Sequence, residues 1–114
     1  MKFITLFILA GCLYFVNPAN AQKKVIADTI HVHGICEMCK ERIENAAYIK
    51  GVKNAKWNAQ TSSLEVFYRT DKTSKEKICQ SIASAGHDND LIKATDEQYA
   101  TVHGCCKYRE QHLH

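Results

Sequence analysis

The sequence predicts an α+β domain in which two helices cover one face of a four-stranded antiparallel sheet. Three patterns predict it. Alternating apolar and polar residues are typical of half-buried strands, apolar residues every three or four positions are typical of amphipathic helices, and turn or cap residues separate these stretches. In chain order the stretches are strand, helix, strand, strand, helix and strand. This β-α-β-β-α-β order is that of the ferredoxin-like sandwich.

The first half of this pattern lies between residues 25 and 58. Val25–Val32 ends in an alternation of apolar and polar residues and is expected to be a strand. Residues 37–50 are expected to form a helix that stops at Gly51. Val52–Asn58 is the second expected strand. The apolar side of the helix is expected to consist of Met38, Ile43, Ala46, Ala47 and Ile49.

The second half begins with a strand over residues 64–69, which is close enough to the preceding strand to form a hairpin with it. Thr73 and Glu76 have the spacing of a capping box, which predicts a helix from this point to Gly86. Residues 87–92 are weakly apolar and are expected to form a short edge strand.

Residues 1–21 have the pattern of a signal peptide. A positive start precedes an apolar run over residues 3–16, and Ala19-Asn20-Ala21 has the small-x-small form of a cleavage site. The run is shorter than the roughly 20 residues that a membrane-spanning helix needs. We therefore expect a chain exported to the periplasm or an equivalent compartment, whose mature form begins at Gln22.

Leu9-Ala10-Gly11-Cys12 offers a second interpretation of the same segment, because it resembles a lipoprotein box in which Cys12 would carry lipid. Two features argue against it. Cys12 comes unusually early, and the chain stays apolar directly after it.

The remaining chain is expected to form one small domain, residues 22–94, and a tail, residues 95–114. Thr95 and Gln98 have capping-box spacing, which predicts one or two helical turns at the start of the tail. The formal net charge of +3 and the lack of a basic run argue against a nucleic-acid partner. No residue pattern for hydrolysis or phosphoryl transfer is present, so we expect a protein that is not an enzyme.

Cys36 and Cys39 lie three residues apart, where the first strand leads into the first helix. The unpaired N–H groups of a helix start favour thiolates, which bind soft metals. Cu(I) needs two or three thiolates, whereas Zn(II) prefers four ligands. A thiol–disulfide redox pair and a structural disulfide are alternatives. Redox domains of the thioredoxin kind depend on a proline opposite their cysteines, but the single proline of this chain is Pro18.

The stretch Gly34–Glu44, followed by Lys50-Gly51-Val52 and by Lys77-Ile78 through Ala85-Gly86-His87, resembles the heavy-metal-associated domain. That family includes copper chaperones and the N-terminal domains of copper-transporting ATPases. The resemblance covers about residues 25–92. The usual loop of the family is Gly-Met-x-Cys-x-x-Cys, whereas here only Ile35 separates Gly34 from the first cysteine.

This resemblance implies that Cys36 and Cys39 are metal ligands and that Cu(I) is the leading ion, with Zn(II) or another soft heavy metal as alternatives. It offers His87 as a third ligand or as a polar neighbour of the metal. It also implies chaperoning, sequestration or delivery of the ion to a transport or efflux partner, by a monomer or a metal-bridged dimer.

The tail carries a second cysteine cluster in His103-Gly104-Cys105-Cys106. Adjacent cysteines rarely pair with each other because the ring is strained. If the tail folds back, Cys105 and Cys106 join the first two cysteines in a four-sulfur site suited to Zn(II) or a small Cu(I) cluster. Alternatively, they form a separate site with His103, or a disulfide to another chain. A structural Zn(II) module therefore remains an alternative function.

Overall fold

The computed structural model describes residues 24–110. The expected signal peptide, the start at Gln22 and Cys12 lie outside these residues and stay predictions. Among the residues that are described, no helix has both the length and the apolar character needed to cross a membrane.

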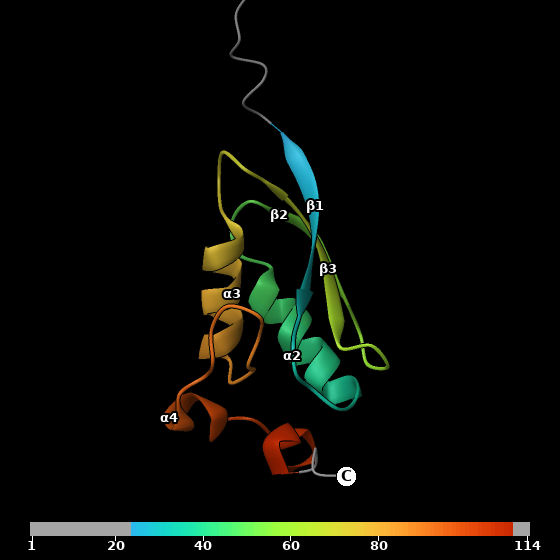
Figure 1. The fold of residues 1–114 in the computed structure, drawn as a ribbon, viewed down its shortest axis with the longest axis vertical. Coiled ribbons are helices and arrows are strands. Elements are labelled where there is room, and N and C mark those ends of the chain that lie inside the picture. Colours follow the sequence, from blue (N-terminus) through green and yellow to red (C-terminus); the bar gives the residue numbers. More distant parts are fainter. Residues whose placement is uncertain (1–23, 111–114) are drawn as a thin grey trace, which may run out of the picture.

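Three antiparallel strands form an open sheet in the order β1-β3-β2 (Figure 1). The strands are β1 (Val25–His31), β2 (Val52–Asn58) and β3 (Ser63–Arg69). In the central strand, alternate residues such as Leu64 and Val66 are buried, while Glu65 between them is exposed. This alternation is the one that the sequence predicts, and it directs one face of the sheet toward the core.

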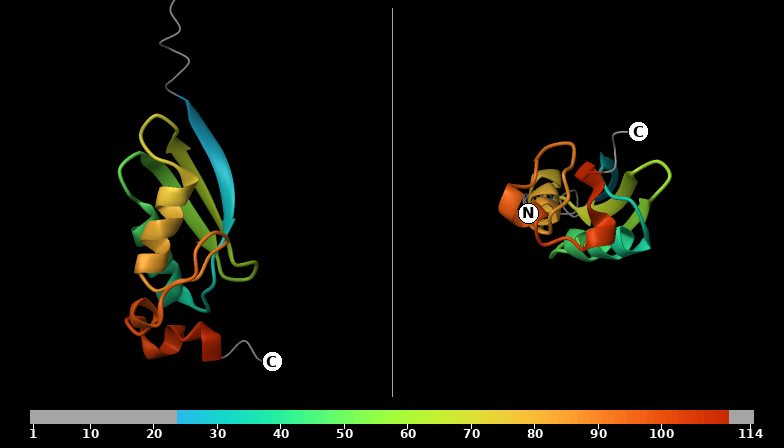
Figure 2. Two further views of the ribbon diagram at one scale, coloured as in Figure 1. Left: turned by 60° about the vertical axis from the view of Figure 1, so that its left-hand side comes forward. Right: turned by 90° about the horizontal axis from the view of Figure 1, so that it is seen from below.

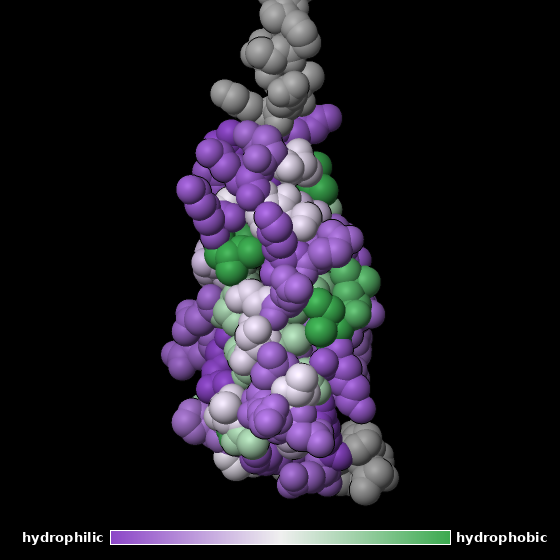
Figure 3. All heavy atoms as spheres, turned by 90° about the vertical axis from the view of Figure 1, so that its left-hand side faces the viewer, coloured by the Kyte–Doolittle hydropathy of each residue, from purple (hydrophilic) through white to green (hydrophobic). Residues whose placement is uncertain are grey.

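Two helices, α2 (Glu37–Ala47) and α3 (Lys75–Ser84), pack on that face (Figures 1 and 2). Helix α2 buries Cys39, Ile43 and Ala47. Helix α3 buries an equivalent stripe that includes Ile78 and Ile82. The sandwich of two helices on one face of an antiparallel sheet confirms the predicted fold class. On the face drawn in Figure 3 the apolar residues occur as separate groups rather than as one patch.

The expected fourth strand is reduced to a single β-bridge between Val32 and Asn89. The physical reason is local competition for backbone N–H groups. The Asn89 side-chain oxygen accepts hydrogen bonds from the N–H groups of Leu91 and Ile92, at 3.2 and 3.1 Å. The carboxylate of Asp88 accepts another from Ala94 at 2.8 Å. These bonds turn the segment back on itself after one bridge.

The two helices also differ from the sequence prediction in detail. Helix α2 ends at Ala47, three residues before the predicted end, and the Tyr48 hydroxyl accepts a hydrogen bond from the N–H of Ala55 in β2. Helix α3 is capped by Ser74, whose hydroxyl accepts from the N–H of Lys77, and not by Thr73.

The tail folds back across the end of the domain where α2 begins (Figure 1). It consists of α4 (Asp96–Tyr99) and two short 3-10 turns, η2 (Gly104–Cys106) and η3 (Tyr108–Glu110). The predicted capping box at the start of α4 is present in full.

A set of polar contacts from η3 holds the tail in this place. The Tyr108 hydroxyl donates to the carbonyl of Gly86 at 2.6 Å and accepts from the N–H of Asp88 at 2.9 Å. The Arg109 guanidinium donates to both carboxylate oxygens of Asp88, at 2.8 and 3.1 Å, and to the carbonyl of Ala94 at 2.7 Å. The guanidinium also lies 4.3 Å from the centre of the Tyr99 ring, a cation–π contact. The tail is therefore an integral layer of the domain.

Candidate metal site

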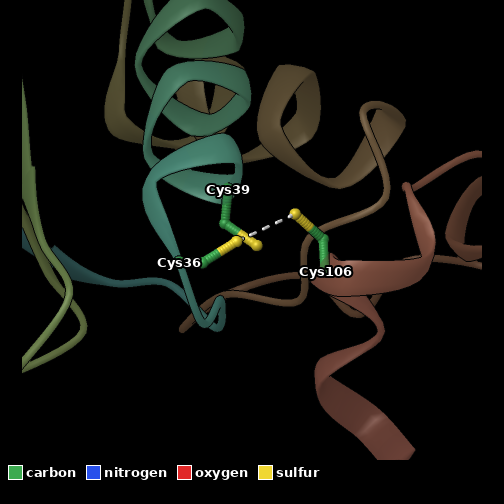
Figure 4. A group of neighbouring side chains, drawn as sticks. All are labelled: Cys36, Cys39 and Cys106. Atoms are coloured by element: carbon green, nitrogen blue, oxygen red, sulfur yellow. Dashed lines mark hydrogen bonds between the residues drawn. The ribbon is translucent and has the colours of Figure 1, made fainter.

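Three thiols from two distant parts of the chain meet at this end of the molecule. The sulfur atoms of Cys36, Cys39 and Cys106 all lie within 4.8 Å of one another. The side chains point toward one another, two from the start of α2 and one from η2 (Figure 4). The Sγ atoms of Cys36 and Cys106 are 3.8 Å apart. Among the residues that the structure describes, no other group of three potential ligands is this close.

The backbone around the first two cysteines fixes their geometry. Cys36 is the N-cap of α2, with extended backbone angles, and Cys39 follows one turn later with no exposed surface. Gly34, which precedes the two cysteines, lies close to the side chains of Cys39 and Trp57. A Cβ atom at that position would lie 3.0 Å from the Cβ of Cys39 and 3.1 Å from the Trp57 ring. A larger residue therefore requires these side chains to shift by a few tenths of an ångström.

The electrostatics of the cluster favour a cation. The backbone N–H of Cys39 is the main cause that lowers the pKa of the Cys36 thiol, although burial opposes it. The pKa of Cys106 is raised, first by burial and then by its neighbours Cys39 and Cys36. Without a metal, the Cys36 thiol therefore loses its proton more readily than the Cys106 thiol. A bound cation favours the thiolate form of both, because a coordinating thiol loses its proton.

Two further sulfur atoms lie on the outer side of the cluster. The Sγ of Cys105 is 3.8 Å from the Sγ of Cys36 and 3.3 Å from the Sδ of Met38. Met38 is 42% exposed, which corrects its prediction as a core residue. Its side chain contacts the tail instead of the sheet. Sequence reasoning missed Met38 as a site residue, although its place between two cysteines was a usable signal.

The two histidines offered as ligands are not part of the three-thiol group. His87 is fully buried, and its Nδ1 lies 2.8 Å from the carbonyl oxygen of His33. Its Nε2 is buried without a hydrogen-bond partner, and its ring stacks on Tyr108. Burial lowers the pKa of His87, so the neutral ring is favoured. His103 is exposed and precedes η2 as its N-cap.

The chain belongs to the heavy-metal-associated domain family, whose model matches residues 29–88. Domains of this family are metal-binding modules. The matched segment contains Cys36 and Cys39, whereas Cys105 and Cys106 lie beyond it. The sulfur atoms of the tail therefore lie outside the part of the chain that the family model describes.

Solved structures of the same fold agree with this family. The chain is 27% identical to a structure titled CopZ metallochaperone, with a TM-score of 0.55, over 57% of this chain and 100% of that one. It is 25% identical to oxidized MerP from Ralstonia metallidurans CH34, with a TM-score of 0.56, over 59% and 96% of the two chains. A putative copper-ion-binding protein from Bacillus anthracis str. Ames shares the fold at 23% identity, with a TM-score of 0.57, over 60% and 99%. The search of curated proteins gave no match.

Proposed function

We propose that this protein is an exported Cu(I) carrier that binds its ion through Cys36, Cys39 and Cys106 and delivers it to a transport or efflux partner. The observation that carries the proposal is the meeting of three thiols from α2 and the tail within 4.8 Å. Cu(I) is here the cargo of the protein, and the protein is not an enzyme.

The sulfur geometry supports a soft ion with few ligands. Metal–sulfur bonds of about 2.3 Å place three sulfurs around one ion about 4.0 Å apart, and four sulfurs about 3.8 Å apart. The Cys36–Cys106 separation of 3.8 Å needs little adjustment to reach either arrangement. Three thiolates complete the usual coordination of Cu(I) but leave Zn(II) one ligand short.

Delivery is supported by the position of the site at one end of the molecule (Figure 1). Cys36 is only partly buried, so an incoming ligand reaches its sulfur without unfolding the domain. A partner's thiol then replaces one cysteine at a time. The same accessibility allows two chains to share one ion, so the experiments also measure whether a monomer or a metal-bridged dimer forms. The signal-like pattern of residues 1–21 supports export.

The test is competition for Cu(I) against a chromogenic chelator, under anaerobic and reducing conditions. The proposal predicts that the wild type competes and that a Cys36→Ser/Cys39→Ser variant does not. Cys79→Ala is the matched control, because Cys79 is a buried thiol in α3 that is not part of the cluster. Equal competition by the wild type and the double variant would refute the proposal.

One observation favours a structural Zn(II) site as the second candidate. Cys105 lies 3.8 Å from Cys36 and supplies the fourth sulfur that Zn(II) requires. If Zn(II) is the resident ion, Cys105→Ser lowers Zn(II) affinity strongly and destabilises the domain. If Cu(I) is the cargo, the same variant retains tight binding of the first Cu(I).

A further inference from the structure

The outer side of the cluster holds two sulfur atoms that the three-thiol site leaves unused. Cys105 and Met38 are both exposed, and their sulfurs are 3.3 Å apart. Cys39 and Cys106, by contrast, have no exposed surface. Cys36 lies between the two pairs, with its sulfur 3.8 Å from both Cys105 and Cys106. The five sulfurs therefore divide into an inner and an outer set that share the Cys36 thiol.

We propose that Cys36, Cys105 and Met38 form an outer position for a second Cu(I), joined to the inner ion by a bridging Cys36 sulfur. The inference rests on the proposed function, because the inner ion is the one held by the three thiols. Cu(I) suits the outer set, since soft monovalent copper accepts thiolate and thioether sulfur alike. A hard cation would have no oxygen ligand in this set.

Charge does not oppose a second ion. Three thiolates around one Cu(I) carry a net charge of −2. When a second Cu(I) replaces the proton of Cys105, four thiolates and two Cu(I) again carry −2, so no further charge is placed in the partly buried site. Met38 supplies a sulfur ligand without adding a charge, because a thioether is neutral.

The position of Met38 also supports an outer Cu(I) site. An apolar side chain on α2 would ordinarily pack against the sheet, as Ile43 does. Met38 instead faces the tail, and the sulfur–sulfur contact with Cys105 joins the first turn of α2 to η2. The outer ion is the one that the ligands of a partner reach first. The outer position is therefore the point from which Cu(I) is exchanged.

Native mass spectrometry of the reduced full chain, titrated anaerobically with Cu(I) as its acetonitrile complex, tests this inference. We expect two Cu(I) ions per monomer in the wild type and one in Cys105→Ser and in Met38→Leu. The Met38→Leu change nearly conserves volume, so it removes the sulfur without removing the packing. Cys79→Ala should keep both ions, because that thiol is buried and is not part of the cluster.

A second measurement identifies the ligand directly. With selenomethionine at Met38, copper X-ray absorption of the doubly loaded protein should show a copper–selenium contact that disappears in Met38→Leu. One Cu(I) in the wild type, two ions in both outer variants, or ions shared between two chains would each overturn the inference. Binding of no Cu(I) at all by the wild type would instead refute the proposed function.

Discussion

Removal of the Tyr108 hydroxyl is the strongest single test of how the tail is held on the domain. Tyr108 is 6% exposed, and its hydroxyl donates to a backbone carbonyl in a buried contact and accepts from a backbone N–H in a partly buried one. Tyr108→Phe keeps the ring but leaves the carbonyl of Gly86 and the N–H of Asp88 without this partner. Each lost hydrogen bond costs about 1 to 1.5 kcal/mol, so the free energy of unfolding should fall by about 2 to 3 kcal/mol.

For a domain of this size, that loss corresponds to a decrease in Tm of roughly 10 to 20 °C. Thermal unfolding followed by fluorescence measures it, because Trp57 is the single tryptophan and is buried in the core. Tyr48→Phe is the matched control. The Tyr48 hydroxyl also makes two hydrogen bonds, but this residue is 48% exposed. Water can replace those bonds, so the expected loss is below about 1 kcal/mol. Equal losses in the two variants would refute the account of the tail as a docked layer.

Three further predictions concern the site and its support. Cys106→Ser should weaken Cu(I) binding at least about tenfold, or about 1.4 kcal/mol, in chelator competition; unchanged affinity would exclude a tail ligand. Gly86→Ala should lower both Tm and Cu(I) affinity, because φ is +101° and a Cβ would lie 2.7 Å from the carbonyl oxygen of Gln98; a stable variant would contradict the tight contact with the tail. Burial raises the pKa of Asp88, but hydrogen bonds from Arg109 and from the N–H of Ala94, together with the positive charge of Arg109, leave that pKa lowered. The stabilisation is therefore complete above the unfolded pKa of about 3.9 and is lost as the pH falls through the folded value; acid titration of an Arg109→Gln variant should show a smaller loss.

The regular elements could be predicted from the sequence because their signals are local. Alternation in β3 and the apolar stripe of α3 each depend on residues within one element, and the structure agrees with both. The reduction of the predicted fourth strand to a single bridge could not be predicted, because it depends on side chains that compete for backbone N–H groups. Asn89 and Asp88 carry those bonds. The misplaced cap at Thr73 differs by one residue, which is the scale on which helix ends are hard to place.

The site could be predicted only in part. The spacing of Cys36 and Cys39 places both thiols on the first turn of a helix, and no tertiary information is needed for that. Their meeting with Cys106 depends on contacts between η3 and the loop after α3, which no local pattern reveals. The sequence left open whether the tail folds back, and the structure shows that it does. The role of each thiol as a ligand stays a prediction.

A thiol from the tail is proposed to complete a three-sulfur Cu(I) site with the two cysteines of α2. Copper X-ray absorption of the reduced protein with one equivalent of Cu(I) counts these ligands. We expect three sulfur ligands in the wild type and two in Cys106→Ser. Two sulfur ligands in both proteins would contradict this proposal, because the ion would then be held by Cys36 and Cys39 alone.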